Sequence, residues 1–151
     1  MPSFSDIPDH IGQLITDHIK LYLEHPEDAH MWDSSPVGVP GPVPTLLLTT
    51  IGRKSGKERH APLLYVERRG AYVVIGSKGG NPDDPTWYRN LQSHPDCEVR
   101  VGALRTRARG RVLEGEEREA VWSEVVLKYP VYVKYQRRTD RQIPVILLEP
   151  T

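Results

Sequence analysis

The sequence predicts a mainly β fold of the α+β class, a small antiparallel barrel with helices at its periphery. About six short segments read as strands, and turns rich in glycine, asparagine or arginine separate most of them. About three or four segments with helical periodicity lie before, between and after these strands rather than alternating with them. This order disfavours a doubly wound parallel sheet, and closure into a barrel removes the edges that hairpins otherwise expose.

The N-terminal part of the chain predicts a helix followed by a loop. Asp6 suits an N-cap, and apolar and aromatic residues recur at helical spacing over residues 5–24. Residues 24–44 are rich in proline, glycine, aspartate and histidine. We therefore expect a loop with one docked turn there, anchored by Met31 and Trp32.

Strands and short turns dominate the middle of the chain. We expect strands over residues 45–51, 62–67 and 71–77, with turns at 52–57 and 68–70. A short helix should follow and end near His94, because Asp84 suits its N-cap and Pro85 its first helical position.

The C-terminal part predicts a second hairpin, two helices and a closing strand. The hairpin covers residues 97–113 and turns at Gly102. Its second arm places four arginines on one face, which should be exposed: Arg105, Arg107, Arg109 and Arg111. Helices over 114–128 and 129–138, separated by a break at Pro130, precede a strand over 143–149. No repeat or composition shift divides the chain, so we expect one domain over residues 1–151.

Composition and charge argue against several classes of protein. Twenty basic residues balance twenty acidic ones, and the arginine face lacks interleaved aromatic residues, so we expect no nucleic-acid partner. The six histidines show no metal-ligand spacing with the single cysteine, Cys97, and we expect no metal site. We expect a cytoplasmic protein, since the N-terminus does not resemble a signal peptide and no segment approaches about 20 consecutive apolar residues.

Two glycine-containing segments are candidate ligand-binding loops. The turn at 52–57 offers backbone amides and polar side chains suited to a phosphate or carboxylate: Arg53, Lys54, Ser55 and Lys57. It lacks the spacing of a nucleotide-binding P-loop, and a solvated hairpin turn would have the same composition. The second segment follows an apolar strand, and Ser77, Lys78 and Gly79 there can donate to an anionic or carbonyl-rich ring or form only a flexible turn.

Two aromatic segments could line a site or only pack. Trp87 suits a helix packed on the barrel, with Asn90 as a polar anchor beside it. Tyr129, Tyr132 and Tyr135 recur every three residues. They could pack as an amphipathic face, or they could wall a pocket for a flat substrate and offer a hydroxyl as a proton donor.

Taken in order, these segments resemble the deazaflavin (coenzyme F420)-dependent nitroreductases of actinobacteria and related microbes. The resemblance covers about residues 45–150. It rests on an ordered series of motifs: Thr49-Thr50-Ile51-Gly52-Arg53-Lys54-Ser55-Gly56, Arg59, Pro62-Leu63, Ser77-Lys78-Gly79-Gly80, Trp87-Tyr88-Arg89-Asn90, Tyr129-Pro130, Tyr132, Tyr135-Gln136, Thr139-Asp140-Arg141 and Ile143-Pro144-Val145. It implies a split β-barrel of the flavin-reductase, FMN-binding type that uses reduced coenzyme F420.

The resemblance also implies roles for individual residues. The cofactor's phosphate would be held by Arg53, Lys54, Ser55, Lys57 and Arg59. The deazaflavin ring would be lined by Pro62, Leu63, Ser77, Lys78 and Gly79, with Asn90 nearby. The substrate side would be formed by Tyr129, Tyr132 and Tyr135.

The implied reaction is hydride transfer to a conjugated small molecule, namely a quinone, an enone lactone or a nitroaromatic. Tyr132 or Ser77 would orient or protonate the product as the catalytic residue. Ala61 and Arg138 depart from residues found in relatives near the acceptor pocket, which leaves the acceptor open. An FMN-dependent enzyme on the same barrel and a non-catalytic carrier of a flavin-like cofactor are the alternatives.

The resemblance suggests two further contacts. In relatives the N-terminal helix can cover the pocket or lean on a membrane, which would put the protein at the inner face of the cell membrane. A membrane-binding helix needs a basic polar face, whereas this one carries Asp6, Asp9, Asp17 and Lys20, so a lid packed on the barrel is favoured. Barrels of this type also pair, so a homodimer is expected by analogy.

Overall fold

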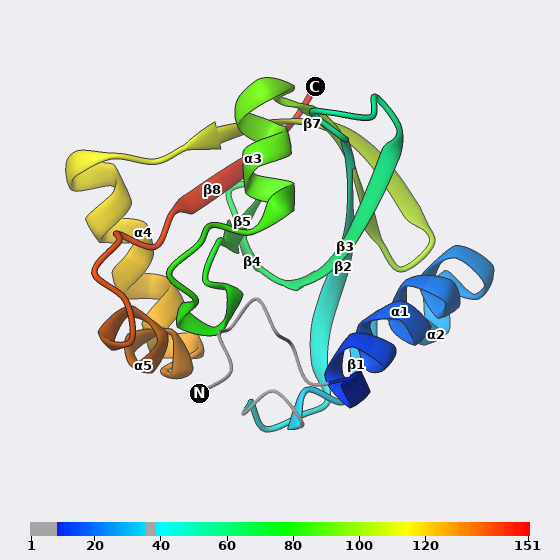
Figure 1. The fold of residues 1–151 in the computed structure, drawn as a ribbon, viewed down its shortest axis with the longest axis horizontal. Helices are drawn as coiled ribbons and strands as arrows, with labels where there is room; N and C mark the ends of the chain where they lie inside the picture. Colours follow the sequence, from blue (N-terminus) through cyan, green and yellow to red (C-terminus); the bar gives the residue numbers. More distant parts are fainter. Residues whose placement is uncertain (1–8, 36–38) are drawn as a thin grey trace.

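Antiparallel pairing joins the strands into one curled sheet, an incomplete barrel (Figure 1). The computed structural model describes residues 9–35 and 39–151. The elements are α1 (Asp9–Glu24), α2 (Pro26–Ala29), β1 (Met31–Trp32), β2 (Val43–Ile51), β3 (Glu58–Leu64), β4 (Val66–Arg68), β5 (Ala71–Ile75), the 3₁₀ turn η2 (Lys78–Gly80), α3 (Thr86–Ser93), β6 (Asp96–Val101), β7 (Leu104–Val112), α4 (Gly115–Lys128), α5 (Val131–Arg137) and β8 (Val145–Pro150). The strand order is β1-β2-β6-β7-β8-β5-β4, and β3 also pairs with β2. The predicted mainly β barrel with peripheral helices is confirmed.

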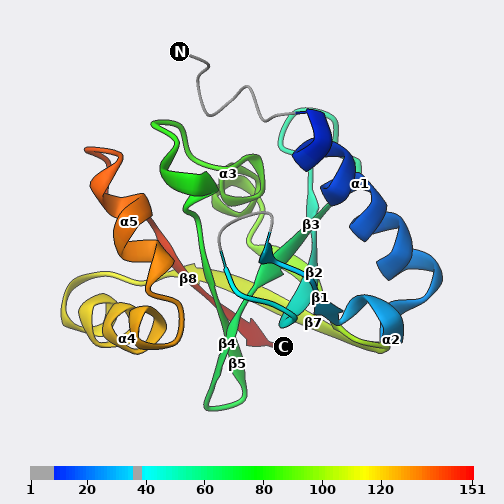
Figure 2. The ribbon, with the colours of Figure 1, turned by 90° about the horizontal axis from the view of Figure 1, so that it is seen from below.

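The helices lie in three places around the sheet. Both views put α1 with α2 at one end of the molecule and α4 with α5 at the other, and α3 lies between them (Figures 1 and 2). Among the described residues, no helix is long and apolar enough to cross a membrane.

Strand β2 is buried on both faces. Leu46 and Leu48 enter the barrel core with Val99 and Ile146. Leu47 points the other way and packs with Tyr22 and Ala29 of the α1–α2 layer. The continuous apolar run of this strand is therefore explained by the helical cover on its outer face, since a strand with one solvated face would alternate.

Strand β7 has the opposite character. Its four arginines are exposed, as the alternation predicts, and three of them pair with acids across the sheet or on α4: Arg105 with Glu98, Arg109 with Asp96, and Arg111 with Glu117 and Glu149. Acids of neighbouring elements therefore balance three of the four charges on this face.

Several boundaries differ from the sequence prediction. The segment expected to be a loop over 24–44 contains α2 and β1, and its expected anchor Met31 is 49% exposed while Trp32 is half-buried. The strand expected over 62–67 begins at Glu58 and is interrupted at Tyr65.

The predicted cap of α3 is wrong. Pro85 occupies the N-cap position, and Asp84 instead forms an ion pair with Arg141 at 3.0 Å. The expected helix over 5–24 is present from Asp9 onward, and Asp6 lies outside the described residues.

Two side chains fix α1 to the sheet. The Tyr22 hydroxyl donates to the Thr45 carbonyl at 2.7 Å and accepts from the Gly102 amide at 3.0 Å. The His18 ring stacks on Trp32, and its Nε2 lies 2.9 Å from the Ala29 carbonyl. A carbonyl only accepts, so Nε2 carries the proton and the neutral ring leaves Nδ1 bare, buried and without a partner in the described part of the chain.

This arrangement makes the stability of the fold depend on pH. Burial lowers the pKa of His18, against the smaller opposing effect of its bond to Ala29. His18 then binds a proton more readily in the unfolded chain than in the folded one. The contribution of the neutral His18 ring to the free energy of unfolding is therefore fully present above about pH 6.5 and is lost as the pH falls through the folded-state pKa of His18. We expect thermal melting to show this decline between about pH 7 and 5. His18→Gln should weaken the decline, whereas His94→Gln, at an exposed site, should not; equal slopes in both variants would contradict the assignment.

Candidate functional site

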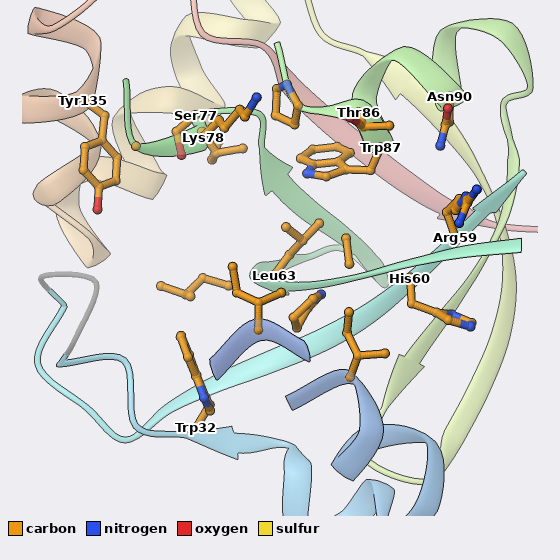
Figure 3. Close-up of a pocket in the computed structure, with 18 of the residues that line it drawn as sticks. Trp32, Arg59, His60, Leu63, Ser77, Lys78, Thr86, Trp87, Asn90 and Tyr135 are labelled. Carbon is orange, nitrogen blue, oxygen red and sulfur yellow. The ribbon is translucent and has the colours of Figure 1, made fainter. Parts of the chain in front are cut away.

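A cavity of about 700 Å³ lies between β3 and four surrounding elements (Figure 3). Helix α1 contributes Ile15 and Ile19 to its wall, α3 contributes Trp87, and α5 contributes Tyr132 and Tyr135. All seven residues of β3 line it, and the segment after β5 adds Ser77, Lys78 and Gly79. The walls are largely apolar, with a small number of polar groups from the start of β3, the segment after β5 and α3, which is the usual composition of a small-molecule site.

Strand β3 gives the cavity a free backbone edge. Within the described chain it pairs with β2 alone. The Gly52 amide donates to the Lys57 carbonyl and closes the turn, so these two residues face each other as a hydrogen-bonded pair. Hydrogen-bonded and non-hydrogen-bonded pairs alternate along an antiparallel ladder, and His60 and Pro62 fall in non-hydrogen-bonded pairs. Their backbone polar groups therefore point away from β2. Pro62 fits this position because it has no N–H to give to a ladder. The edge can therefore bond to the polar rim of a flat ligand.

The Ser77–Gly79 segment offers a second set of donors. Ser77 has right-handed backbone angles (φ −77°, ψ −40°), while Lys78 and Gly79 are left-handed, with φ of 45° and 65°. A succession of right-handed and left-handed residues of this kind forms a concave nest of amides, which suits anionic or carbonyl oxygens. Within the described residues, the amides of Ser77, Lys78 and Gly79 donate no hydrogen bond.

The basic turn expected to bind phosphate lies next to the cavity rather than in its wall. Arg59 lines the cavity, whereas Arg53, Lys54 and Lys57 are exposed on the turn outside it. Ser55 has a structural task, since its hydroxyl accepts from the Lys57 amide at 3.2 Å.

Asn90 joins this turn to α3. It is 1% exposed and lines the cavity, its carbonyl oxygen accepts from the Arg53 amide at 3.1 Å, and its amide donates to Thr50 at 3.1 Å. The side chain thereby sets the position of the turn relative to the cavity, a function that the sequence did not indicate.

The three tyrosines do not share one site. Tyr132 and Tyr135 line the cavity, but Tyr129 lines a second one of about 830 Å³ beside Lys128 and Pro130. The reason is that α4 ends at Lys128 and α5 begins at Val131, so Tyr129 belongs to neither helix and the spacing of three does not hold it on the face of Tyr132.

Burial changes the pKa of Tyr132, which lies in the cavity wall. Tyr132 is 7% exposed, and burial together with its neighbours Tyr135 and Tyr129 strongly raises its pKa. Its ring meets that of Tyr135 edge-on at 5.9 Å. The phenol therefore stays protonated at neutral pH and can act as a donor but not as a base.

Several lining residues were missed from the sequence. His60 and Trp32 lie on the α1 side of β3, opposite Trp87 and Ser77 (Figure 3). The His60 Nδ1 lies 2.9 Å from the Thr49 hydroxyl, and burial lowers the pKa of His60. A histidine in an edge strand carries no spacing signal, and only the α1 cover makes it part of a cavity wall.

These residues fit a flat cofactor with an anionic group. The apolar walls suit the faces of a ring, the nest and the β3 edge suit its carbonyl rim, and Arg59, Lys78 and the exposed turn suit an anion. The described residues bring no three His, Cys, Asp or Glu side chains together as a metal site.

Comparisons with known proteins agree with this geometry. The family model described as F420H(2)-dependent quinone reductase matches residues 27–150. The F420H(2)-dependent quinone reductase Rv1261c of Mycobacterium tuberculosis is 37% identical over 114 residues, which cover 73% of this chain and 76% of that protein. Rv3178 of the same species, whose name assigns it to this activity provisionally, is 43% identical over 109 residues, covering 72% of this chain and 92% of the relative.

Solved structures give the same result for the fold. The F420-H2 dependent reductase FDR-A is 46% identical with a TM-score of 0.65, covering 70% of this chain and 93% of that chain. A structure described as a domain-swapped dimer has the same identity and TM-score, covering 70% of this chain and 79% of that one. A heme storage protein of Vibrio cholerae, at 17% identity and a TM-score of 0.52, shares the fold alone, covering 71% of this chain and 81% of that one.

Asn90 provides a test of the turn's position. Asn90→Leu removes the partners of the Arg53 amide and the Thr50 hydroxyl, so we expect a loss of about 1–3 kcal/mol in unfolding free energy. Affinity for inorganic phosphate or for the cofactor should fall with it, as measured by titration. Gln92→Leu, an exposed amide on the same helix, should change neither quantity, and identical behaviour of the two variants would contradict the role.

Proposed function

Since the chain belongs to the F420H(2)-dependent quinone reductase family, we propose that it reduces a flat, conjugated acceptor in the cavity between α1, β3, α3 and α5. The family's reaction is a reduction that uses coenzyme F420. The observation that carries the proposal is one cavity with apolar walls on both sides of β3, in which the Ser77–Gly79 segment, Lys78 and Asn90 gather polar groups on the side opposite α1.

The donor-rich side would hold the cofactor. When bound, the reduced deazaflavin supplies a hydride to the acceptor. Ser77, Lys78 and Gly79 would bond to the ring with Pro62, Leu63 and Asn90 around it, and the anionic end would extend toward the basic turn of Arg53, Lys54, Ser55 and Lys57, with Arg59 between. The chain's own contribution is then orientation and exclusion of water rather than a nucleophile.

The tyrosines of α5 would serve the acceptor. Tyr132 is a protonated donor in the wall, and Ser77 is a hydroxyl at the opposite element, so either could orient or protonate the reduced product. Tyr135 would pack against the acceptor's ring. Tyr129 would act only through its edge-on contact with Tyr132, at 6.2 Å between ring centroids.

The acceptor class is the open part of the proposal. Ile15, Ile19 and Trp32 give the α1 side an apolar surface, which suits a quinone, an enone lactone or a nitroaromatic alike. In this reading α1 is a lid over the cavity, and contact with a membrane surface stays a prediction. Pairing into a homodimer also stays a prediction, which the mass of the protein in solution would check.

The first experiment mixes the protein with reduced F420 and menadione and follows the return of oxidised-cofactor absorbance. We expect protein-dependent oxidation, with cofactor affinity at least about tenfold weaker after Lys54→Ala and Lys78→Ala together, because two charge-assisted contacts are lost. Lys20→Ala and Lys134→Ala together remove the same charge elsewhere and should leave the affinity unchanged.

The alternatives give different outcomes in the same cuvette. Binding of F420 without oxidation by any acceptor would indicate a non-catalytic carrier. No binding of F420, with binding of FMN, would indicate an FMN enzyme on the same barrel and would overturn the proposal.

A second experiment tests the proton donor. Tyr132→Phe removes one hydroxyl from the wall and should lower turnover by about 10²-fold while cofactor affinity stays nearly intact. Tyr88→Phe is the matched control, because Tyr88 lies outside the cavity wall on α3. A large loss of cofactor binding in Tyr132→Phe would refute the role in the chemical step.

A further inference from the structure

The segment that lines the donor side has an unusual backbone. Between β5 and α3, three successive residues take left-handed φ angles: Lys78 at 45°, Gly79 at 65° and Gly80 at 83°. For Lys78 this conformation costs energy, because its Cβ crowds the backbone. The segment is not part of the sheet, so other contacts must hold it in place.

Arg141 supplies those contacts from the connection between α5 and β8. Its Nε donates to the Asn81 carbonyl at 2.8 Å, its Nη2 to the Ser77 carbonyl at 2.9 Å, and its Nη1 to the Gly76 carbonyl at 3.1 Å. The same Nη1 bonds to the Asp84 carboxylate at 3.0 Å. One guanidinium thus spans both ends of the segment, and its side chain is only 14% exposed.

These bonds decide where the amides point. In a trans peptide the carbonyl and the next N–H lie on opposite sides. Since the carbonyls of Gly76 and Ser77 face Arg141, the amides of Ser77 and Lys78 face away from it. The cavity wall includes Ser77, Lys78 and Gly79 but not Arg141. The guanidinium therefore contacts the nest on the side that faces away from the cavity.

A second arginine, Arg138, also bonds to the segment between β5 and α3. Arg138 donates from Nη1 to the Gly79 carbonyl at 3.2 Å, and a Cβ on Gly80 would come within 2.6 Å of the Tyr135 carbonyl. Arg138 is exposed, whereas Arg141 is not, so the stronger constraint comes from Arg141.

We propose that Arg141 is a positioning residue that keeps residues 76–81 in the conformation in which the amides of Ser77, Lys78 and Gly79 are available to the cofactor. The inference rests on the proposed function for the identity of the ligand. A lysine cannot replace Arg141, because an ammonium is a point donor and cannot reach three carbonyls in the plane of a guanidinium fork.

The test compares Arg141→Lys and Arg141→Ala with Arg118→Lys and Arg118→Ala in the full chain. Arg118 is a suitable control, since it is also buried and donates to a backbone carbonyl, that of Ile143, outside the cavity wall. We expect Arg141→Lys to bind oxidised F420 at least about tenfold more weakly, the effect of losing charged hydrogen bonds. The Arg118 variants should lower the melting temperature but keep the affinity.

Hydrogen exchange of the cofactor-free protein gives a readout that does not depend on F420. We expect faster exchange in Arg141→Lys at peptides covering residues 76–82 and little change elsewhere. Millimolar guanidinium should restore part of the affinity of Arg141→Ala and should leave the affinity of Arg118→Ala unchanged.

The outcomes separate the two proposals. If the wild type does not bind F420, the proposed function fails, and local exchange at 76–82 still decides the role of Arg141. Wild-type exchange at this segment in Arg141→Lys would overturn the inference. The inference would also be overturned if the Arg141 and Arg118 variants lost F420 affinity in the same proportion to their loss of melting temperature.

Discussion

The burial of β2 on both faces is the constraint on which the rest of the structure depends. Leu46 and Leu48 need the barrel core, while Leu47 needs a cover on the outer face, and only α1 with α2 supplies it. The Tyr22 hydroxyl, which satisfies backbone groups of both β2 and the β6–β7 turn, fixes that cover. Because β3 pairs with β2, the same cover brings α1 alongside β3 and closes one side of the cavity.

The other side of the cavity is held by contacts between distant parts of the chain. Asn90 ties the basic turn to α3, and Arg141 ties the segment after β5 to the connection before β8. Both are side chains that bond mainly to backbone, so each fixes a loop whose own residues have little preference for its shape. In the proposed site the donors would therefore be preorganised by side chains whose own hydrogen bonds go to the backbone, as electrostatic recognition requires.

The parts of this structure that could be predicted from the sequence are those that local periodicity encodes. The alternation of β7, the helix of α4 and the hairpin of β4 and β5 each follow from spacing within a few residues. The two-residue strand β1 and the capping of α3 do not, because pairing with Val43 and an ion pair with Arg141 are long-range events. Tyr129 illustrates the same limit, since its regular spacing crosses a break between two helices. The lining residues His60 and Trp32 depend on where α1 docks, which no local pattern records.

The two sides of the cavity differ in how strongly the fold constrains them. On the donor side, changing a residue disturbs buried hydrogen bonds, so this side should tolerate little variation among proteins that keep one cofactor. On the α1 side the wall is made of apolar side chains such as Ile15 and Ile19, which can change volume at a modest cost because the helix can shift with them. One fold can therefore keep its reductant and change its acceptor, and the identity of the acceptor should be sought in α1 and the segment around Trp32 rather than in the barrel.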